Sequence, residues 1–276
     1  MAPIDDAAVL KVLRRAGFEG PDLLVTLGSG QTDPWRDQRV ASLRYEEVPG
    51  WTQSGVAGHI GRLGMVRRAE GSVLVMEGRH HYYESRSWEG VLAPLRAAVA
   101  LGARIALLTN SAGGLLPDLV PGTLVVTTGS VMAQGPPDMA GVLGRLPRPC
   151  PGRLWWGPGR RVVRDVAGRT GVPVRSGVIW YTPGPTYETR AEAGMARRLG
   201  ASVAAMSLAP EALMAAALGL RVIGLSLVTN QVGGGRIPDH EEVLSAAGRF
   251  QPLLDELLRE VVGPLCGALE TEGEEA

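Results

Sequence analysis

The sequence predicts a single α/β domain over residues 1–276, with a mixed, largely parallel central sheet flanked by helices. One observation is that short apolar runs alternate along the chain with amphipathic stretches, the pattern of strand and helix in turn. A second is composition: among 276 residues, 45% are hydrophobic and 20% charged, as in a protein with a large core. A third is that polar, glycine-rich residues follow several apolar runs, as at the carboxyl ends of parallel strands.

The first half of the chain begins with a predicted helix over Ile4–Arg15, whose apolar residues recur near helical spacing before Gly17. The apolar run that follows ends in a glycine turn and is expected to be the first strand. The elements expected up to the middle of the chain are a strand over 22–27, a hairpin-like pair over 62–78, a helix over 88–101, and strands over 103–114 and 122–129.

A segment rich in proline and glycine, residues 135–159, separates the two halves and predicts a long loop within one domain. The alternation then resumes. A last long helix over His240–Val262 has an apolar face, and the acidic tail 267–276 is expected to fray. Between them we expect helices over 160–169, 188–199 and 210–218, and strands over 173–184, 201–207 and 221–230.

The composition excludes several chemistries. Lys11 is the only lysine, so the chain has neither the Gly-Lys-Ser/Thr of a P-loop nor a suitable Schiff-base lysine. Cys150 and Cys266 lie far apart and predict no disulfide framework or thiolate zinc site. The four histidines lack metal-ligand spacing, and HEEVL from His240 has Leu244 where a zinc protease has histidine. We expect no metal.

The overall charge gives no reason to expect a polyanionic partner. Lys and Arg number 28, as do Asp and Glu, so neither nucleic acid nor an anionic membrane is predicted to bind. The N-terminal MAPIDDAAVL is acidic where a signal peptide is basic. Charged residues interrupt the longest apolar stretches, so no membrane span is predicted. These features predict a soluble, cytoplasmic protein.

Four groups of residues lie where ligands bind in parallel sheets, just beyond predicted strands. The chain has two asparagines, Asn110 and Asn230, and each follows a threonine at the end of a strand. The glycine turn around Ser29 could let backbone N–H groups approach an anion, although a plain tight turn is the commoner use. The four groups are 28–30, 110–114, 206–207 and 229–231.

The segment GRHHYYE, residues 78–84, favours a phosphate site. In an extended chain Arg79, His81 and Tyr83 would share one face, and guanidinium and imidazole groups both donate charge-assisted hydrogen bonds. The alternative is a solvated strand end. In PGPTYETRAE, residues 183–192, Tyr187 and Glu188 could stack on a planar ligand and accept its N–H groups, or could merely begin a helix.

Taken together and in order, these segments resemble the trimeric family of purine nucleoside phosphorylases. Each motif is weak alone, but eight of them occur in the right order and span nearly the whole chain. The matching segments are GSG (28–30), GHIGRL (58–63), EGRHHYYE (77–84), TNSAGGL (109–115), GPTYETRAE (184–192), AMSLAPE (205–211), SLVTN (226–230) and HEEVL (240–244).

The resemblance implies that orthophosphate, as co-substrate, attacks C1′ of a purine nucleoside and releases the base and ribose 1-phosphate. It implies no cofactor and a homotrimer. Asn230, His81, Glu188 and His59 would be the catalytic residues. The implied phosphate ligands are Ser29, Arg79, His81, Ser207 and the backbone around Ser111, with His59 on a mobile loop beside them. Tyr83, Met206 and His240 would contact the sugar. Tyr187 would pack on the base, Glu188 would accept hydrogen bonds at the N1/N2 edge of the base, and Asn230 would bind N7 and the 6-substituent.

These residue types suit the chemistry. Glycosidic cleavage passes through an oxocarbenium-like state, in which the purine gains negative charge. A phosphate dianion supplies the nucleophile, so no protein nucleophile is required. An amide at Asn230 that donates more strongly to N7 as charge develops would stabilise the transition state. Because an amide can also donate to O6, asparagine favours the 6-oxopurines of inosine and guanosine over adenosine.

The chain departs from the family pattern at four places. The family loop continues GSGLG, whereas here it is GSGQTDP; Ala205 replaces a common glycine, and Gln231 follows Asn230 where other residues are usual. The fourth is the segment 135–159, which does not follow the family pattern that delivers an aromatic residue to the neighbouring subunit. Trp155 and Trp156 are the candidates for that role.

Two other functions stay open at the level of sequence. A methylthioadenosine phosphorylase of the same fold would prefer an acid near Asn230 and small apolar residues in place of His240. A non-catalytic purine-binding relative is made plausible by the altered GSGQTDP turn. A nucleoside hydrolase is disfavoured because the chain has no acidic calcium cluster.

Overall fold

A nine-stranded mixed sheet forms the centre of the computed structural model, which describes residues 4–135, 138–148, 154–233 and 239–274. Its order is β2-β3-β4-β1-β5-β8-β7-β6-β9. Neighbours are parallel in five pairs, β1–β4, β1–β5, β5–β9, β6–β7 and β7–β8. The strands are β1 (Leu23–Leu27), β2 (Arg39–Arg44), β3 (Arg62–Arg68), β4 (Gly71–Glu77), β5 (Ile105–Gly114), β6 (Leu124–Val131), β7 (Val174–Tyr181), β8 (Val203–Ala205) and β9 (Arg221–Gln231).

Five of these strands close into a ring. Strand β9 pairs with β6 on one side and with β5 on the other, so β5, β8, β7, β6 and β9 form a small barrel from which the remaining strands extend. The ring depends on the length of β5 and β9, which run side by side in parallel from Ile105↔Arg221 to Gly114↔Gln231. Their carboxyl ends therefore emerge together at one rim of the barrel.

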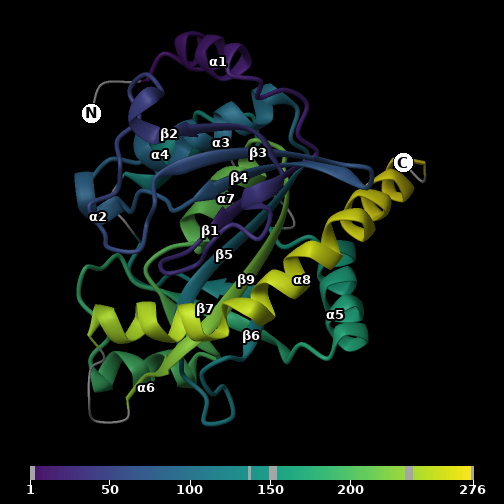
Figure 1. The fold of residues 1–276 in the computed structure, drawn as a ribbon. Helices are drawn as coiled ribbons and strands as arrows, with labels where there is room; N and C mark the ends of the chain where they lie inside the picture. The colour runs from purple at the N-terminus through teal and green to yellow at the C-terminus, as the bar shows by residue number, and fades with distance from the viewer. Residues whose placement is uncertain (1–3, 136–137, 149–153, 234–238, 275–276) are drawn as a thin grey trace.

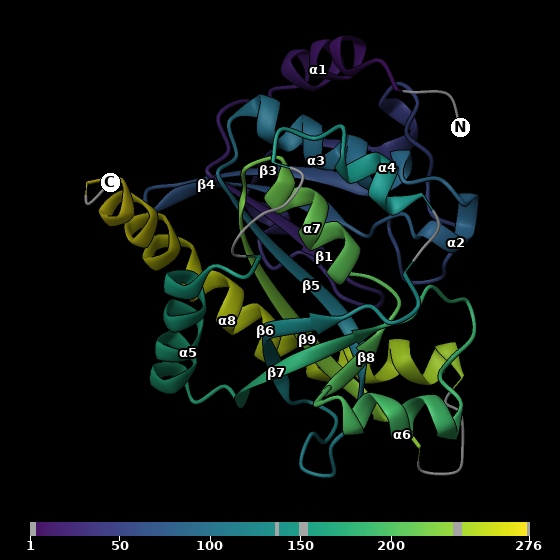
Figure 2. The ribbon, with the colours of Figure 1, turned by 180° about the vertical axis from the view of Figure 1, so that it is seen from behind.

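Helices cover the sheet on both faces, α5 and α8 on one and α3 and α7 on the other (Figures 1 and 2). The two larger clusters of buried side chains reflect this arrangement: in β1, Leu23 and Val25 belong to the cluster under α8, and Leu24 belongs to the opposite one. Burial on both faces is typical of a central parallel strand. The helices are α1 (Asp6–Arg15), α2 (Tyr82–Ser85), α3 (Glu89–Leu101), α4 (Met139–Leu143), α5 (Gly157–Thr170), α6 (Arg190–Arg198), α7 (Ala209–Ala217) and α8 (His240–Glu274).

The predicted α/β fold is confirmed, and most elements lie within a few residues of their expected bounds. Strand β2 and helix α4 were not expected. Residues Tyr82–Ser85 form a short helix in place of the extended segment predicted there. In the described part of the chain, no helix has both the length and the apolar character needed to cross a membrane.

Two expectations for the second half are corrected. The tail expected to fray continues α8 as far as Glu274, because Glu272 accepts from Trp156 Nε1 at 2.8 Å and pairs with Arg221 at 3.0 Å. Trp155 and Trp156 are 8% and 5% exposed and pack into the two cores of their own chain, so neither extends toward a neighbouring subunit. Cys150 lies outside the described residues.

Candidate active site

A cavity of about 270 Å³ opens at the barrel rim where β5 and β9 end. It gathers side chains from segments that are far apart in sequence, from Ser29 after β1 to Val243 in α8. Every residue proposed from the sequence lines it except His59. The predicted residues found there are Ser29, Arg79, His81, Tyr83, Ser111, Tyr187, Glu188, Met206, Ser207, Asn230 and His240.

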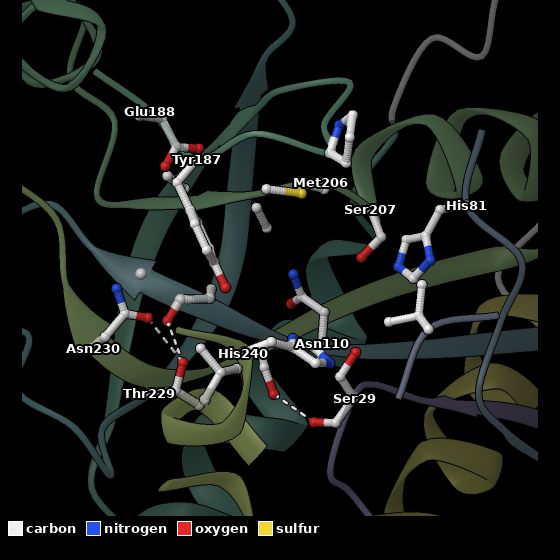
Figure 3. A pocket seen from close by; sticks show the side chains of 18 of the residues that line it. Ser29, His81, Asn110, Tyr187, Glu188, Met206, Ser207, Thr229, Asn230 and His240 are labelled. Atoms are coloured by element: carbon white, nitrogen blue, oxygen red, sulfur yellow. Dashed lines mark hydrogen bonds between the residues drawn. The ribbon is translucent and has the colours of Figure 1, made fainter. Parts of the chain in front are cut away.

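The polar groups divide between two ends of this cavity (Figure 3). Asn230, Tyr187 and Glu188 lie toward one side. Ser29, Ser207 and His81 lie toward the other, with Met206 and Asn110 between the two groups. We call the first group the amide–carboxylate end and the second, together with Arg79 and Ser111, the hydroxyl–cation end.

At the hydroxyl–cation end, the altered GSGQTDP turn is held by its own glutamine. Gln31 Oε1 accepts from Gly28 N–H at 2.7 Å and also from the Thr109 hydroxyl. Gly28 packs directly on β5, where a Cβ atom would come within 2.6 Å of Asn110 Cα. Ser111 Oγ donates to the Ser29 carbonyl at 2.9 Å. The departure from the family pattern therefore yields an ordered turn with Ser29 beside the cavity.

His59 lies behind Ser29. Its Nδ1 accepts from the Arg79 backbone N–H at 3.2 Å, so Nε2 carries the proton of the neutral ring and lies 3.1 Å from Ser29 Oγ. Burial, assisted by the charges of His81 and Arg79, lowers the pKa of His59 well below its ordinary 6.5. The resemblance implied a mobile loop; in the structure this side chain is 6% exposed and packs against Gly78.

A buried carboxylate holds His81. Glu84 Oε1 accepts from the His81 backbone N–H at 2.7 Å and lies 3.0 Å from Nδ1 of the His81 ring. Glu84 Oε2 accepts from the Gly55 N–H at 2.8 Å. Ser54 Oγ also donates to this carboxylate, at 2.9 Å. Burial opposes its ionisation, but these hydrogen bonds outweigh it and lower the pKa of Glu84 to about 2. The Tyr83 ring stacks on His81, with centroids 5.0 Å apart.

At the amide–carboxylate end, a β-bulge directs the side chains. Ala112 of β5 pairs with Val228 and Gly113 pairs with Asn230, so Thr229 is the extra residue of β9. The Thr229 hydroxyl donates to Asn230 Oδ1 at 3.1 Å (Figure 3), which leaves the Asn230 NH₂ group as the donor available to a ligand. Gln231 turns away and donates to the carbonyls of Leu116 and Leu119.

Glu188 and Tyr187 lie on the loop before α6, which begins two residues later than expected. The Glu188 carboxylate is 9% exposed and accepts from Thr182 Oγ1 at 3.1 Å. Burial raises the pKa of Glu188 above its ordinary value and does the same for the half-buried Tyr187 phenol. One Glu188 oxygen has the Thr182 hydroxyl as its partner, and the carboxylate borders the cavity as an acceptor.

His240 opens helix α8 at the cavity edge. Its Nε2 lies 2.7 Å from the Ala57 carbonyl, so this nitrogen donates and Nδ1 is left as an acceptor. Leu244, one turn further, packs closely on Gly58 and Gly30. The start of α8 therefore closes one side of the cavity and fixes the loop that carries His59.

Sequence reasoning missed several supporting residues. Asn110 was noted only as a strand-end residue; it is 1% exposed, lines the cavity, and neither of its side-chain polar atoms has a hydrogen-bond partner among the described residues. Glu84, Glu211 and Thr229 hold cavity residues through contacts with other side chains. All three residues lie within the motifs quoted above, but the side chains that they contact could be identified only from the structure.

The chain matches a recognised class of proteins. A family model described as the phosphorylase superfamily matches residues 22–263 of the chain. The match runs from the start of β1 into α8 and therefore includes every side chain of the cavity.

Comparison with individual proteins narrows the class. Purine nucleoside phosphorylase of Mycobacterium leprae is 36% identical over 258 residues, covering 90% of this chain and 91% of the relative. Purine nucleoside phosphorylase 1 of Geobacillus stearothermophilus is 33% identical over 220 residues, covering 78% and 80%. The Schistosoma mansoni purine nucleoside phosphorylase in complex with adenosine has a TM-score of 0.83 at 28% identity, covering 94% of this chain and 96% of that one. The chain belongs to the purine nucleoside phosphorylase family.

Proposed function

We propose that this enzyme catalyses the phosphorolysis of purine nucleosides of the inosine and guanosine type, yielding the free base and ribose 1-phosphate. The observation that carries the proposal is the division of one cavity into a hydroxyl–cation end and an amide–carboxylate end. Orthophosphate suits the first, because guanidinium, imidazole and hydroxyl groups donate to a dianion. A 6-oxopurine suits the second, because it presents O6 and N7 to an amide donor and N1–H to a carboxylate acceptor.

In this proposal phosphate is bound by Arg79, His81, Ser29 and Ser207, with the β5 backbone around Ser111 beneath it. His59 supports Ser29 from behind, through its neutral ring. The phosphate attacks C1′ as the glycosidic bond breaks, and the sugar passes through an oxocarbenium-like state that the dianion stabilises. Phosphate supplies the nucleophile, and the chain positions it.

The leaving base acquires negative charge at the other end. The Asn230 NH₂ group, oriented by Thr229, donates to N7 and O6 and binds more strongly as that charge develops. Glu188 accepts from N1–H, and Tyr187 packs on the ring. Tyr83, Met206 and the Nδ1 acceptor of His240 border the space left for the ribose.

Several further properties form part of the proposal. The enzyme acts in purine salvage in the cytoplasm, as a homotrimer and without a cofactor. Light scattering on the purified protein tests the trimer, because a monomer has a mass of 29.1 kDa and a trimer about three times that value.

The deciding experiment follows inosine and guanosine cleavage with and without orthophosphate, with adenosine and methylthioadenosine as comparison substrates. Phosphate-dependent release of hypoxanthine or guanine, with the two adenine nucleosides slow, is expected. Preferential cleavage of methylthioadenosine would identify the related phosphorylase instead. Binding of purine bases without cleavage of any nucleoside would identify a non-catalytic relative.

A further inference from the structure

Arg79 of the hydroxyl–cation end forms an ion pair inside the protein. Its Nε lies 3.0 Å from Glu211 Oε2, and the two side chains are 6% and 7% exposed. The two atoms are within ion-pair distance but are not aligned as a hydrogen bond. Arg79 follows β4, whereas Glu211 lies in the first turn of α7, directly after the segment that carries Met206 and Ser207. Glu211 does not line the 270 Å³ cavity. It lies behind the cavity wall, where a small pocket brings it together with Arg79, Met206 and Ser207.

Arg79 has no second carboxylate. Among the described residues, Glu211 is the one acid within ion-pair distance of its guanidinium, and the other side-chain contact is a 3.4 Å hydrogen bond from Nη2 to the Thr26 carbonyl. A buried guanidinium without a counter-charge is strongly unfavourable. Burial lowers the pKa of the nearby His59, so its neutral ring adds no second positive charge beside Arg79. Glu211 is thus the counter-charge that holds Arg79 in place beside the cavity.

The pair also borders a second, smaller cavity. This second cavity of about 20 Å³ is lined by Arg79 and Glu211 together with Trp51 and His80. A volume of this order accommodates about one water molecule. The ion pair therefore lies between the ligand cavity and this second cavity, whose lining also includes the apolar side chains Met76, Val91 and Pro94.

We propose that Glu211 is a positioning residue for phosphate: its carboxylate fixes the Arg79 guanidinium at the hydroxyl–cation end and thereby sets phosphate affinity. This inference rests on the proposed function for the identity of the anion. It assigns Glu211 no contact with the nucleoside, so nucleoside affinity measured at saturating phosphate is expected to be independent of it.

The test compares wild type with Glu211→Gln, which keeps the shape and removes the charge, and Glu211→Asp, which keeps the charge. Binding of inorganic phosphate is titrated calorimetrically without nucleoside, and steady-state KM values are measured for phosphate and inosine. For Glu211→Gln we expect the phosphate Kd and KM to rise at least about tenfold, with the inosine KM within twofold of wild type, since one lost charge contact of this kind is worth about a factor of ten. Glu211→Asp should recover part of the affinity.

Two controls separate positioning from damage to the fold. Glu89→Gln removes an acid that pairs with Arg96 at 2.5 Å outside the cavity, and it should leave the phosphate Kd unchanged. In an Arg79→Ala background the unpaired Glu211 would repel phosphate, so adding Glu211→Gln should improve phosphate binding or leave it unchanged. A general loss of structure caused by Glu211→Gln would instead weaken phosphate binding further in this background.

An unchanged phosphate Kd in Glu211→Gln, or equal losses for phosphate and inosine, would overturn the inference. So would a further loss of phosphate binding in the double variant. A wild-type protein that binds phosphate but cleaves no nucleoside would overturn the proposed function instead, and the Glu211 inference would then be decided by the phosphate Kd values alone.

Discussion

Replacing Glu84 by glutamine should destabilise the enzyme by an amount that depends on pH. The folded protein lowers the pKa of this carboxyl from 4.5 to about 2, through hydrogen bonds from His81 and Gly55 that outweigh burial. At about 1.36 kcal/mol per pKa unit, the ionised form contributes about 3 kcal/mol to stability at pH 7. Its side chain is 10% exposed, so solvent screens these contacts little. Glu84→Gln should therefore lose about 3 kcal/mol at pH 7.

The sign of the pH dependence follows from the lowered pKa. Stability from Glu84 is complete above pH 4.5 and is lost as pH falls toward 2, because the unfolded chain takes up the proton first. Urea unfolding should show that the difference in unfolding free energy between wild type and Glu84→Gln is about 1.4 kcal/mol smaller at pH 3.5 than at pH 7. Glu47→Gln is the matched control, since Glu47 holds the same capping-box position on an exposed 3₁₀ turn and should cost far less. The same difference in unfolding free energy between wild type and Glu84→Gln at both pH values would refute the reasoning.

Three further predictions concern the cavity. Asn230→Ala should lower kcat by about 10²-fold or more, as for the loss of one transition-state donor, and near-normal kinetics would contradict its role. The pKa of His59 in the folded protein lies well below 6.5, so the unfolded chain takes up the proton first as pH falls. The unfolding free energy of wild type should therefore decrease from pH 7 to 5 by up to about 1.36 kcal/mol per pH unit, and this decrease should be shallower in His59→Gln. Burial raises the pKa of Glu188, so the carboxylate acceptor is protonated as pH falls and the inosine KM should rise. This rise should be absent in Glu188→Gln. Identical pH profiles of KM in the two proteins would argue against a carboxylate acceptor.

The local pattern of the sequence was sufficient to predict the strands that run through the centre of the molecule. Strands such as β1 are buried throughout and almost entirely apolar because both faces are covered, and polar residues of the cavity follow their ends. The edge strand β2 escaped prediction because its residues RVASLR alternate between half-buried and exposed, with charges at both ends. Closure of the ring could not be predicted either, since it depends on pairing between β5 and β9 across more than 110 residues.

The candidate site was predicted as a set of residues but not as a network. Sequence motifs identified Arg79 and His81, because donors to an anion have a recognisable chemistry. The acids that hold them, Glu211 and Glu84, are ordinary helix-start residues by pattern, and burial alone distinguishes them. The burial of Trp156 was likewise decided by a distant partner, Glu272, which no local pattern connects to it.

The closed ring of strands has a consequence for how the chain is made. Strand β9 emerges from the ribosome after the other four strands of the ring, and until it arrives one edge of β5 and one edge of β6 lack their final partner. Unpaired strand edges invite association with other chains. We therefore expect fragments that end before Arg221 to aggregate, and chaperone dependence during synthesis to end once β9 has been released. The cavity itself is completed only after that step, because the start of α8, which follows β9, is its last part to be made.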